Sequence, residues 1–555
     1  MRPRLPILVL SFSLSALGGC VTTPKAPPPL TEEQKLAAEV SQLAAEAQAL
    51  LQAQDALVWS YWSEGSRVDV ASTYAGREEL FSLANIRKID QLRQRTTEPR
   101  ELRALTALQS HFAGEYLAQQ LAELNDAIAN LEASLTFQVE GREVRWRELE
   151  RLLANEWSGT KRRALYEAAV PALERLNPLL RRREERMEAR VRELGYPSYE
   201  ALGGELRQAD LARLGLLAEE VLQATEAPYK EVMERLAQQE LRLPFSKLTR
   251  ADLPRLFRPR DVGTFFPRGM LVLRAHGTLA GMGIDLAEMK NVRLDSRDDV
   301  PRKNPRPLAL GIQVPGDVRL SVRPAEGPLE QSRLLHEFGH ALHYAFTEEP
   351  RFELAKLGNP TVTEAYGALF EDLMEDPVWL EEHAGLSGKD RSEYLAATSA
   401  HKLFLIRRAA GRLLYQLALH REEGVEAPEL YRAILQRTDG IPVTEADLAR
   451  HLVDLEDFYL SADNFRAWFL AGQLQGQLKA RFGPAWWRSQ EAGAFLRELW
   501  SHGNALSARE VAQRMGENGI TPDVLLLRLG TTLQVPITLD VHLEEAPPAP
   551  APAEQ

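Results

Sequence analysis

The sequence predicts a mostly α-helical protein with a minor β element, and three observations lead to that prediction. From Thr31 to about Leu243, leucines and alanines recur every three or four residues while glycine and proline are scarce, a pattern typical of amphipathic helices. The same pattern returns from Leu329 to Leu529. Between these two parts, prolines cluster and short strand-like runs appear. Residues 31–540 contain no convincing linker, so we treat them as one large unit.

Length, charge and cysteine content restrict the class of protein. The chain has 555 residues, of which 44% are hydrophobic and 26% charged, as in globular proteins. Its 67 basic and 79 acidic side chains give a net charge of −12, which argues against a nucleic-acid partner because such a protein needs a basic face. The single cysteine, Cys20, excludes a cysteine-ligated zinc site, a disulfide framework and a thiol nucleophile in the body of the protein.

Residues 1–19 have the features of a secretory signal peptide, since two arginines precede an apolar stretch that is too short to span a bilayer stably. The segment LGGC at residues 17–20 resembles the lipobox of bacterial lipoproteins, which implies cleavage before Cys20 and a lipid anchor on its thiol. Because the next residue is Val21 and not aspartate, the resemblance implies an exported lipoprotein of the outer membrane, facing the periplasm or the cell surface. An ordinary cleaved signal with an incidental cysteine is the alternative.

Proline-rich segments flank the predicted helical unit. Residues 20–30 should form an extended linker from the membrane, and the Pro/Ala/Glu-rich residues 541–555 are predicted to be a disordered tail. At the start of the unit, the sequence TEEQ from Thr31 to Gln34 has the form of a capping box that opens a long helix.

The predicted β element consists of short runs near the middle of the unit, at Met270–Leu273, Leu308–Val314 and Val318–Val322. We expect them to form a small sheet or a few ribbons. One more strand-like run, TTLQVPITLDVHL, covers Thr531–Leu543 near the end of the chain.

Residues 336–340 spell HExxH within an apolar segment. Residues four apart share a helix face, so His336 and His340 can both direct an imidazole nitrogen at one Zn²⁺. Glu337 would then lie beside the metal, where it can take a proton from a zinc-bound water and later deliver it to a leaving amine. The alternative is a core helix with two hydrogen-bonded histidines and an end-on glutamate.

Glu364 is the candidate for the third ligand that a catalytic zinc usually requires. Pro360 and the threonines after it predict the start of a helix, and Glu364 lies in its first turns. From the local sequence alone, a capping-box glutamate paired with Thr361 is the preferred interpretation.

HEFGHALHY followed by TEAYGALFEDLME resembles the helical gluzincin metallopeptidases, the group that holds the angiotensin-converting-enzyme-like and the thimet-oligopeptidase or oligoendopeptidase-like families. The 23 residues between His340 and Glu364 match the spacing of the angiotensin-converting-enzyme-like family. The resemblance is strong at residues 334–372 and weak over the rest of the helical unit. It implies His336, His340 and Glu364 as zinc ligands and Glu337 as the general base. It also implies a large helical metallopeptidase fold with a deep cleft that admits short peptides, and an edge strand that can pair with the substrate backbone.

Two features near the motif bear on the support of the zinc histidines. Ala368 stands where the angiotensin-converting-enzyme-like family has an aspartate, and Glu371 and Asp372 on a similar helical face are candidate substitutes, with a solvated face as the alternative. His343 lies seven residues after His336, and we interpret it as a packed or supporting histidine more readily than as a substrate contact.

These families also supply a tyrosine that stabilises the oxyanion of the tetrahedral intermediate. Where the resemblance would place it, this chain has Phe465, Trp468 and Phe469. Tyr459 is the nearest phenol and Arg466 the nearest cation. We take Tyr459 as the candidate catalytic residue, with a core role as the alternative.

The sequence therefore predicts a membrane-anchored, exported zinc metallopeptidase that acts on oligopeptides. The second hypothesis is a catalytically weak zinc-binding lipoprotein that captures peptides or scaffolds envelope partners, and the missing tyrosine pattern motivates it.

Overall fold

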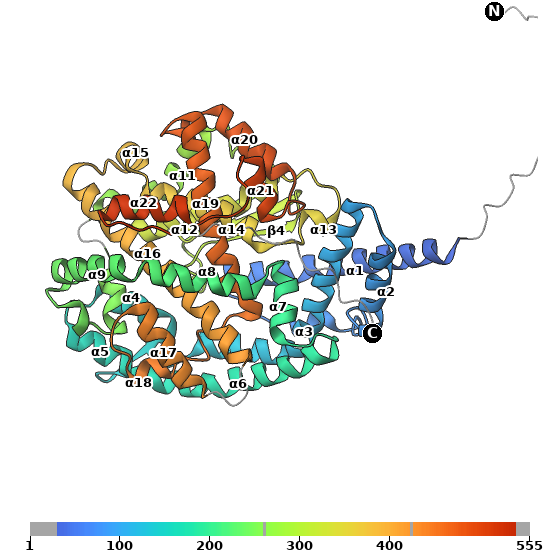
Figure 1. The fold of residues 1–555 in the computed structure, drawn as a ribbon, viewed down its shortest axis with the longest axis horizontal. Coiled ribbons are helices and arrows are strands. Elements are labelled where there is room, and N and C mark those ends of the chain that lie inside the picture. The colour runs from blue at the N-terminus through green and yellow to red at the C-terminus, as the bar shows by residue number, and fades with distance from the viewer. Residues whose placement is uncertain (1–29, 259–261, 422–425, 540–555) are drawn as a thin grey trace, which may run out of the picture.

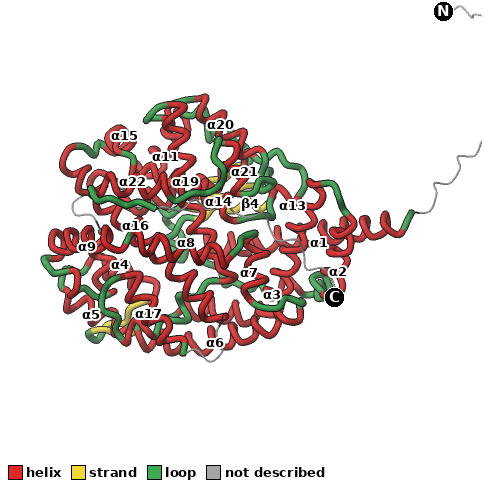
Figure 2. The backbone as a smooth tube through the Cα atoms, viewed as in Figure 1, coloured by secondary structure: helices red, strands yellow, loops and turns green. Residues whose placement is uncertain are grey.

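The computed structural model describes residues 30–258, 262–421 and 426–539. Over these residues the chain is largely helical with two small sheets, which confirms the prediction of a mostly α protein (Figure 2). The predicted signal peptide at 1–19, the lipid-anchor residue Cys20, all but the last residue of the linker and the tail at 541–555 lie outside the described residues. In the described part of the chain, no helix combines the length and the apolar character needed to cross a membrane.

The N-terminal part is built from helices, as its leucine and alanine spacing predicts. Thr31 caps the first helix, since its hydroxyl accepts the backbone N–H of Gln34 while the Gln34 side chain accepts that of Thr31, so the predicted capping box is confirmed. The helices are α1 (Glu32–Glu64), α2 (Leu83–Arg95), α3 (Pro99–Ser134), α4 (Leu149–Asn155), α5 (Gly159–Ala168), α6 (Val170–Glu193), α7 (Tyr199–Arg207), α8 (Leu211–Ala224) and α9 (Glu226–Leu241).

A β-hairpin that the sequence pattern did not predict interrupts these helices. Strands β1 (Thr136–Val139) and β2 (Arg142–Arg145) pair antiparallel. Glu140 and Gly141 connect them, both with positive φ (50° and 75°), which is the backbone that a tight two-residue hairpin turn requires.

The middle of the chain holds α10 (Leu253–Leu256), α11 (Leu271–Gly281) and a three-stranded sheet of β3 (Val292–Asp295), β4 (Leu308–Gln313) and β5 (Asp317–Ser321). The predicted strands at Leu308–Val314 and Val318–Val322 are confirmed as β4 and β5. The predicted strand at Met270–Leu273 is wrong, because this short apolar run ends a 3-10 turn and begins α11, whose buried residues recur at helical spacing. In the strand order β3-β5-β4, β4 pairs antiparallel with β5 and forms an edge.

The C-terminal part is again helical, as predicted. Its helices are α12 (Pro328–Phe346), α13 (Phe352–Ala355), α14 (Pro360–Glu371), α15 (Pro377–Trp379), α16 (Gly388–Arg421), α17 (Ala427–Asp439), α18 (Glu445–Leu448), α19 (Leu460–Phe482), α20 (Gln490–Ser501), α21 (Ala508–Arg514) and α22 (Asp523–Leu533). The strand predicted at Thr531–Leu543 is wrong over its described residues, because α22 continues to Leu533 and no strand follows up to residue 539.

The largest buried apolar cluster of the described residues extends from Val40 in α1 to Ile537 after α22. Figure 1 shows α12, α14, β4 and α19–α22 in the upper part of the molecule, and α5, α6, α17 and α18 in the lower part. The long helix α16 contacts α19 and α22 above and α8 and α17 below. Within the upper part α14 lies between α12 and α19, so both of its neighbours hold it in place.

Candidate metal centre

Helix α12 places His336, Glu337 and His340 on the side away from its apolar core face. Pro328 opens the helix, where its missing N–H costs no hydrogen bond. Leu334, Leu335, Phe338, Ala341 and Leu342 are all buried and fix one face against the core. The predicted zinc histidines and Glu337 therefore lie on the remaining face.

Two glycines let α14 approach α12 closely. A Cβ atom on Gly339 would lie 2.3 Å from the carbonyl oxygen of Tyr366, and one on Gly367 would lie 2.8 Å from the imidazole of His336. At Gly339 the obstacle is backbone, so only glycine fits there, whereas a methyl group at Gly367 would require the His336 ring to turn. The close approach brings Glu364 of α14 to the histidines of α12.

His336, His340 and Glu364 converge as predicted, with one ligand atom from each within 4.8 Å of the others. The two Nε2 atoms lie 3.0 Å apart. Glu364 Oε2 lies 3.5 Å from His336 Nε2, and Oε1 lies 3.8 Å from His340 Nε2. Tetrahedral ligands with bonds of about 2.0–2.1 Å would lie about 3.3 Å apart, and two imidazoles with one carboxylate suit a borderline divalent cation such as Zn²⁺. The residues therefore fit the implied metal.

The alternative role for Glu364, a capping box with Thr361, is wrong. Asn359 caps α14, since its side chain accepts the backbone N–H of Thr361. The Thr361 hydroxyl instead donates to Asp463 at 2.7 Å. Glu364 is thus free to face the histidines.

Glu371 supports His336, as one of the two candidates for that role. Its Oε2 accepts a hydrogen bond from His336 Nδ1 at 3.2 Å, which orients the ring with Nε2 toward His340. Asp372, the other candidate, is buried and pairs with Lys402 and Arg528 instead. At the position of the family's aspartate, Ala368 is buried in the core.

His343 is the packed histidine that we expected. It is fully buried, its Nε2 donates to the carbonyl of Gly503 at 3.0 Å, and its Nδ1 lies 3.2 Å from the hydroxyl of Thr363. Burial lowers the pKa of His343 to about 4, so the ring is neutral at pH 7.

The cluster favours positive charge at its centre. Although burial opposes protonation, hydrogen bonds to Glu364 and Glu371 raise the pKa of His336 well above its ordinary value. In His340, burial dominates and lowers the pKa to about 4. The Glu364 carboxylate and two imidazole nitrogens thus converge on one space, and a cation there would satisfy all three groups.

Glu337 is half-buried next to the cluster. Burial raises its pKa to about 7, which suits a group that must both accept and release a proton near neutral pH. Its Oε2 accepts the backbone N–H of Ala309 at 2.6 Å, so the edge strand β4 lies directly against the proposed base.

The structure does not bring Tyr459 to the cluster. The residue is fully buried at the start of α19, where its ring packs on Tyr199 and His420 and its hydroxyl is buried without a hydrogen bond to another described residue. Arg466 is likewise buried, and donates to the carbonyl of Arg207. Neither side chain lines the cavity at the cluster, which matches the core role given as the alternative for Tyr459.

An open cavity of about 780 Å³ lies at the cluster. Besides the predicted residues, it is lined by Leu308, Ala309, Tyr344, Lys356, Gly358, Asn359, Pro360, Thr363 and Asn504. Tyr344 could have been found from the sequence, because it lies one further helical turn along the face of His336 and His340. No sequence signal connects Asn504 to the site, since only the folded chain brings it there.

A scan of the chain against protein-family models matched no family, and a search of curated proteins gave no match.

Proposed function

We propose that this protein is a zinc-dependent hydrolase of peptide bonds in short peptides, in line with the sequence resemblance to the helical gluzincins. The observation that carries the proposal is the convergence of His336, His340 and Glu364 at the wall of an open cavity, with Glu337 beside them.

Zn²⁺ held by these three residues supplies a Lewis acid that activates water and polarises a carbonyl. In this proposal, the Glu337 carboxylate accepts the proton of the attacking water and later transfers it to the leaving amine. Glu371 keeps the His336 ring in the orientation that metal binding needs.

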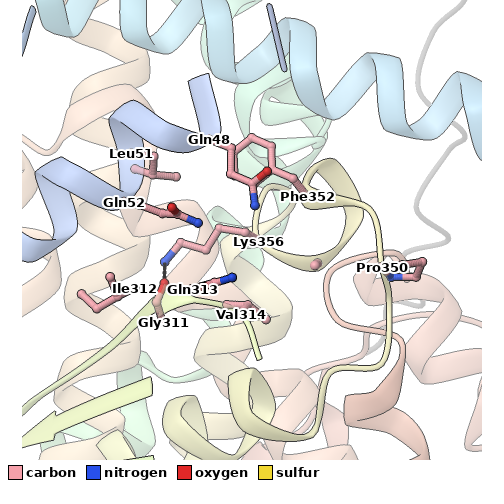
Figure 3. Close-up of a pocket in the computed structure, with 11 residues that line it drawn as sticks. Gln48, Leu51, Gln52, Gly311, Ile312, Gln313, Val314, Pro350, Phe352 and Lys356 are labelled. Carbon is pink, nitrogen blue, oxygen red and sulfur yellow. Dashed lines mark hydrogen bonds between the residues drawn. The ribbon is translucent and has the colours of Figure 1, made fainter. Parts of the chain in front are cut away.

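The edge strand β4 is the proposed guide for the substrate. Leu308 and Ala309 line the same cavity as the metal cluster, and an extended peptide that adds to this edge would direct a backbone carbonyl toward the histidines. Further along, Lys356 donates to the carbonyl of Gly311, and Gln52 of α1 lies beside this end of the strand (Figure 3). The open edge is thus short, which favours small peptides in the deep cleft of the proposed fold.

A lipid on Cys20 would hold this unit at the membrane outside the cytoplasm.

The test is cleavage of quenched fluorescent peptides by the protein without its first 30 residues, comparing wild type with Glu337→Gln. Removal of a general base lowers kcat by about 10²–10⁴-fold, while the metal content should remain one per chain. Glu330→Gln is the matched control, since Glu330 lies on the same helix, pairs with Arg333 and does not line the cavity.

Equal cleavage by wild type and Glu337→Gln would refute the proposed mechanism. Stoichiometric zinc without any cleavage would favour the zinc-binding lipoprotein. A protein that takes up no zinc would refute both.

A further inference from the structure

The cavity at the metal cluster contains one tyrosine whose phenol has no hydrogen bond to any other described residue. The neighbouring polar side chains all have partners: Asn359 donates to the carbonyl of Arg207, Asn504 donates to the carbonyl of Lys356, and Thr363 lies 3.3 Å from the side-chain oxygen of Asn504. Tyr344 lines the same cavity and is the exception within the described part of the chain. Its hydroxyl is therefore available to a ligand.

The ring of Tyr344 is held firmly although its hydroxyl is free. It stacks on His343 with ring centroids 5.7 Å apart, and the ammonium of Lys356 lies 5.0 Å from its centroid. A Cβ atom on Gly311 of β4 would lie 3.1 Å from the ring, so the missing side chain there makes room for it. Lys356 itself is fixed by the carbonyl of Gly311 at 2.9 Å (Figure 3). It also pairs with Asp55 at 3.1 Å. Because these contacts already fix the Tyr344 ring, little side-chain entropy is lost when its hydroxyl binds a ligand.

Helix geometry directs this phenol toward the reacting centre. Tyr344 lies four residues after His340, about 6 Å further along the axis of α12. Long helical side chains point back toward the N-terminus, which carries the Tyr344 ring over the turn that bears His340. Burial raises the pKa of Tyr344, so the phenol keeps its proton and can donate it in a hydrogen bond.

We propose that Tyr344, and not Tyr459, stabilises the oxyanion when the scissile carbonyl is attacked. This inference rests on the proposed peptidase function. The attacking water transfers a proton to the Glu337 carboxylate and forms a C–O bond to the carbonyl carbon, while the π electrons move to the carbonyl oxygen. The Tyr344 hydroxyl donates a hydrogen bond to this oxygen without losing its proton. When the C–N bond breaks, the electron pair returns to the carbonyl and Glu337 protonates the departing amine.

The test is Tyr344→Phe, which removes only the hydroxyl, with Tyr459→Phe as the matched control. Loss of one oxyanion donor lowers kcat by about 10²–10³-fold, and KM and zinc content should stay near wild type. A phosphinic peptide that mimics the tetrahedral state should bind Tyr344→Phe more weakly by a similar factor, as titration calorimetry would show without turnover. Tyr459→Phe should leave all four quantities unchanged.

Several outcomes would overturn the inference. One is unchanged kcat in Tyr344→Phe, and another is an equal loss in Tyr459→Phe. Loss of zinc, or a lower unfolding midpoint that accounts for the lost activity, would assign Tyr344 a structural role instead. Wild type that binds zinc but cleaves no peptide would refute the proposed function itself, whereas active wild type with fully active Tyr344→Phe refutes this inference alone.

Discussion

Two clusters of buried charge in this molecule differ in how they balance themselves. The Asp454 carboxylate accepts hydrogen bonds from Arg250 at 2.9 Å, from Arg408 at 2.5 Å and from the hydroxyl of Tyr431. The guanidinium of Arg412 lies 3.6 Å away. Although burial opposes ionisation, the three arginines hold the pKa of Asp454 well below its ordinary value. This cluster contains its own counter-charges.

At the metal centre, by contrast, the Glu364 carboxylate faces two imidazoles whose Nε2 atoms lie only 3.0 Å apart, and Glu371 bonds the Nδ1 side of the His336 ring. Lone pairs on adjacent nitrogens repel unless a proton or a metal lies between them. A carboxylate in contact with cationic side chains therefore completes a structural cluster. Ligand atoms that converge without a cationic side chain among them indicate a binding site.

The largest expected effect is a loss of unfolding free energy when the Asp454 cluster is disrupted. Asp454→Asn removes the carboxylate that the three arginines share. Arg250 and Arg408 then keep only the more distant Asp439, at 3.8 and 3.5 Å, and Arg412 keeps Glu456. Breaking a buried pair costs about 3–5 kcal/mol of unfolding free energy. Urea denaturation would measure the loss, and the zinc content should remain unchanged. The control is Asp457→Asn, because Asp457 is an exposed partner of Arg183 and should cost less than about 1 kcal/mol.

The pH dependence of this effect has a definite sign. Because the pKa of Asp454 is depressed in the folded protein, its contribution is complete above the unfolded value near 3.8 and is lost as the pH falls further. The difference between wild type and Asp454→Asn should therefore be equal at pH 7 and pH 5 and smaller at pH 3. A difference that already shrinks between pH 7 and 5, or a loss of zinc, would contradict the separation of the two clusters.

Sequence reasoning predicted the parts of the site that depend on short spacing. His336 and His340 follow from helical periodicity. Glu364 was preferred as a ligand only through the resemblance, because its local sequence by itself favours a capping box. Tyr459 does not line the cavity. Its distance along the chain from the HExxH motif does not determine where the start of α19 packs in the fold. The role of Gly339 and Gly367 in the close approach of α12 and α14 could not be predicted from the sequence, because it depends on which helices pack against each other.

The helical class was also predictable from short spacing, whereas strands were predictable only in part: β4 and β5 are confirmed, but other short runs were misassigned or missed. The apolar run at Met270 carries no length or period that separates a strand from a buried helix start. The hairpin at Glu140–Gly141 was missed because its strands are only four residues long each.

A smaller effect is expected from the support of the metal ligands. Glu371→Gln weakens the hydrogen bond that orients His336, and such changes typically lower metal affinity 10–100-fold. Competition with a fluorescent chelator would measure this loss. Glu375→Gln is the matched control, because Glu375 lies one helical turn further, pairs with Arg528 and does not touch His336. Equal affinities in the two variants would show that Glu371 belongs with the structural charges.

The smallest expected effect concerns the crossing of α12 and α14. In Gly367→Ala the new methyl group would lie 2.8 Å from the His336 imidazole, so the ring must turn away. The metal-free protein can accept that turn, but metal binding must reverse it against about 0.5–1.5 kcal/mol of rotamer strain, equivalent to at most about a tenfold loss of affinity. Gly114→Ala is the control, since nothing lies within 4 Å of its Cβ position in α3 and alanine there should stabilise the helix by about 0.5–1 kcal/mol. Unchanged zinc affinity in Gly367→Ala would mean that the close approach of the two helices serves packing alone, and the metal centre would then resemble the Asp454 cluster more than we propose.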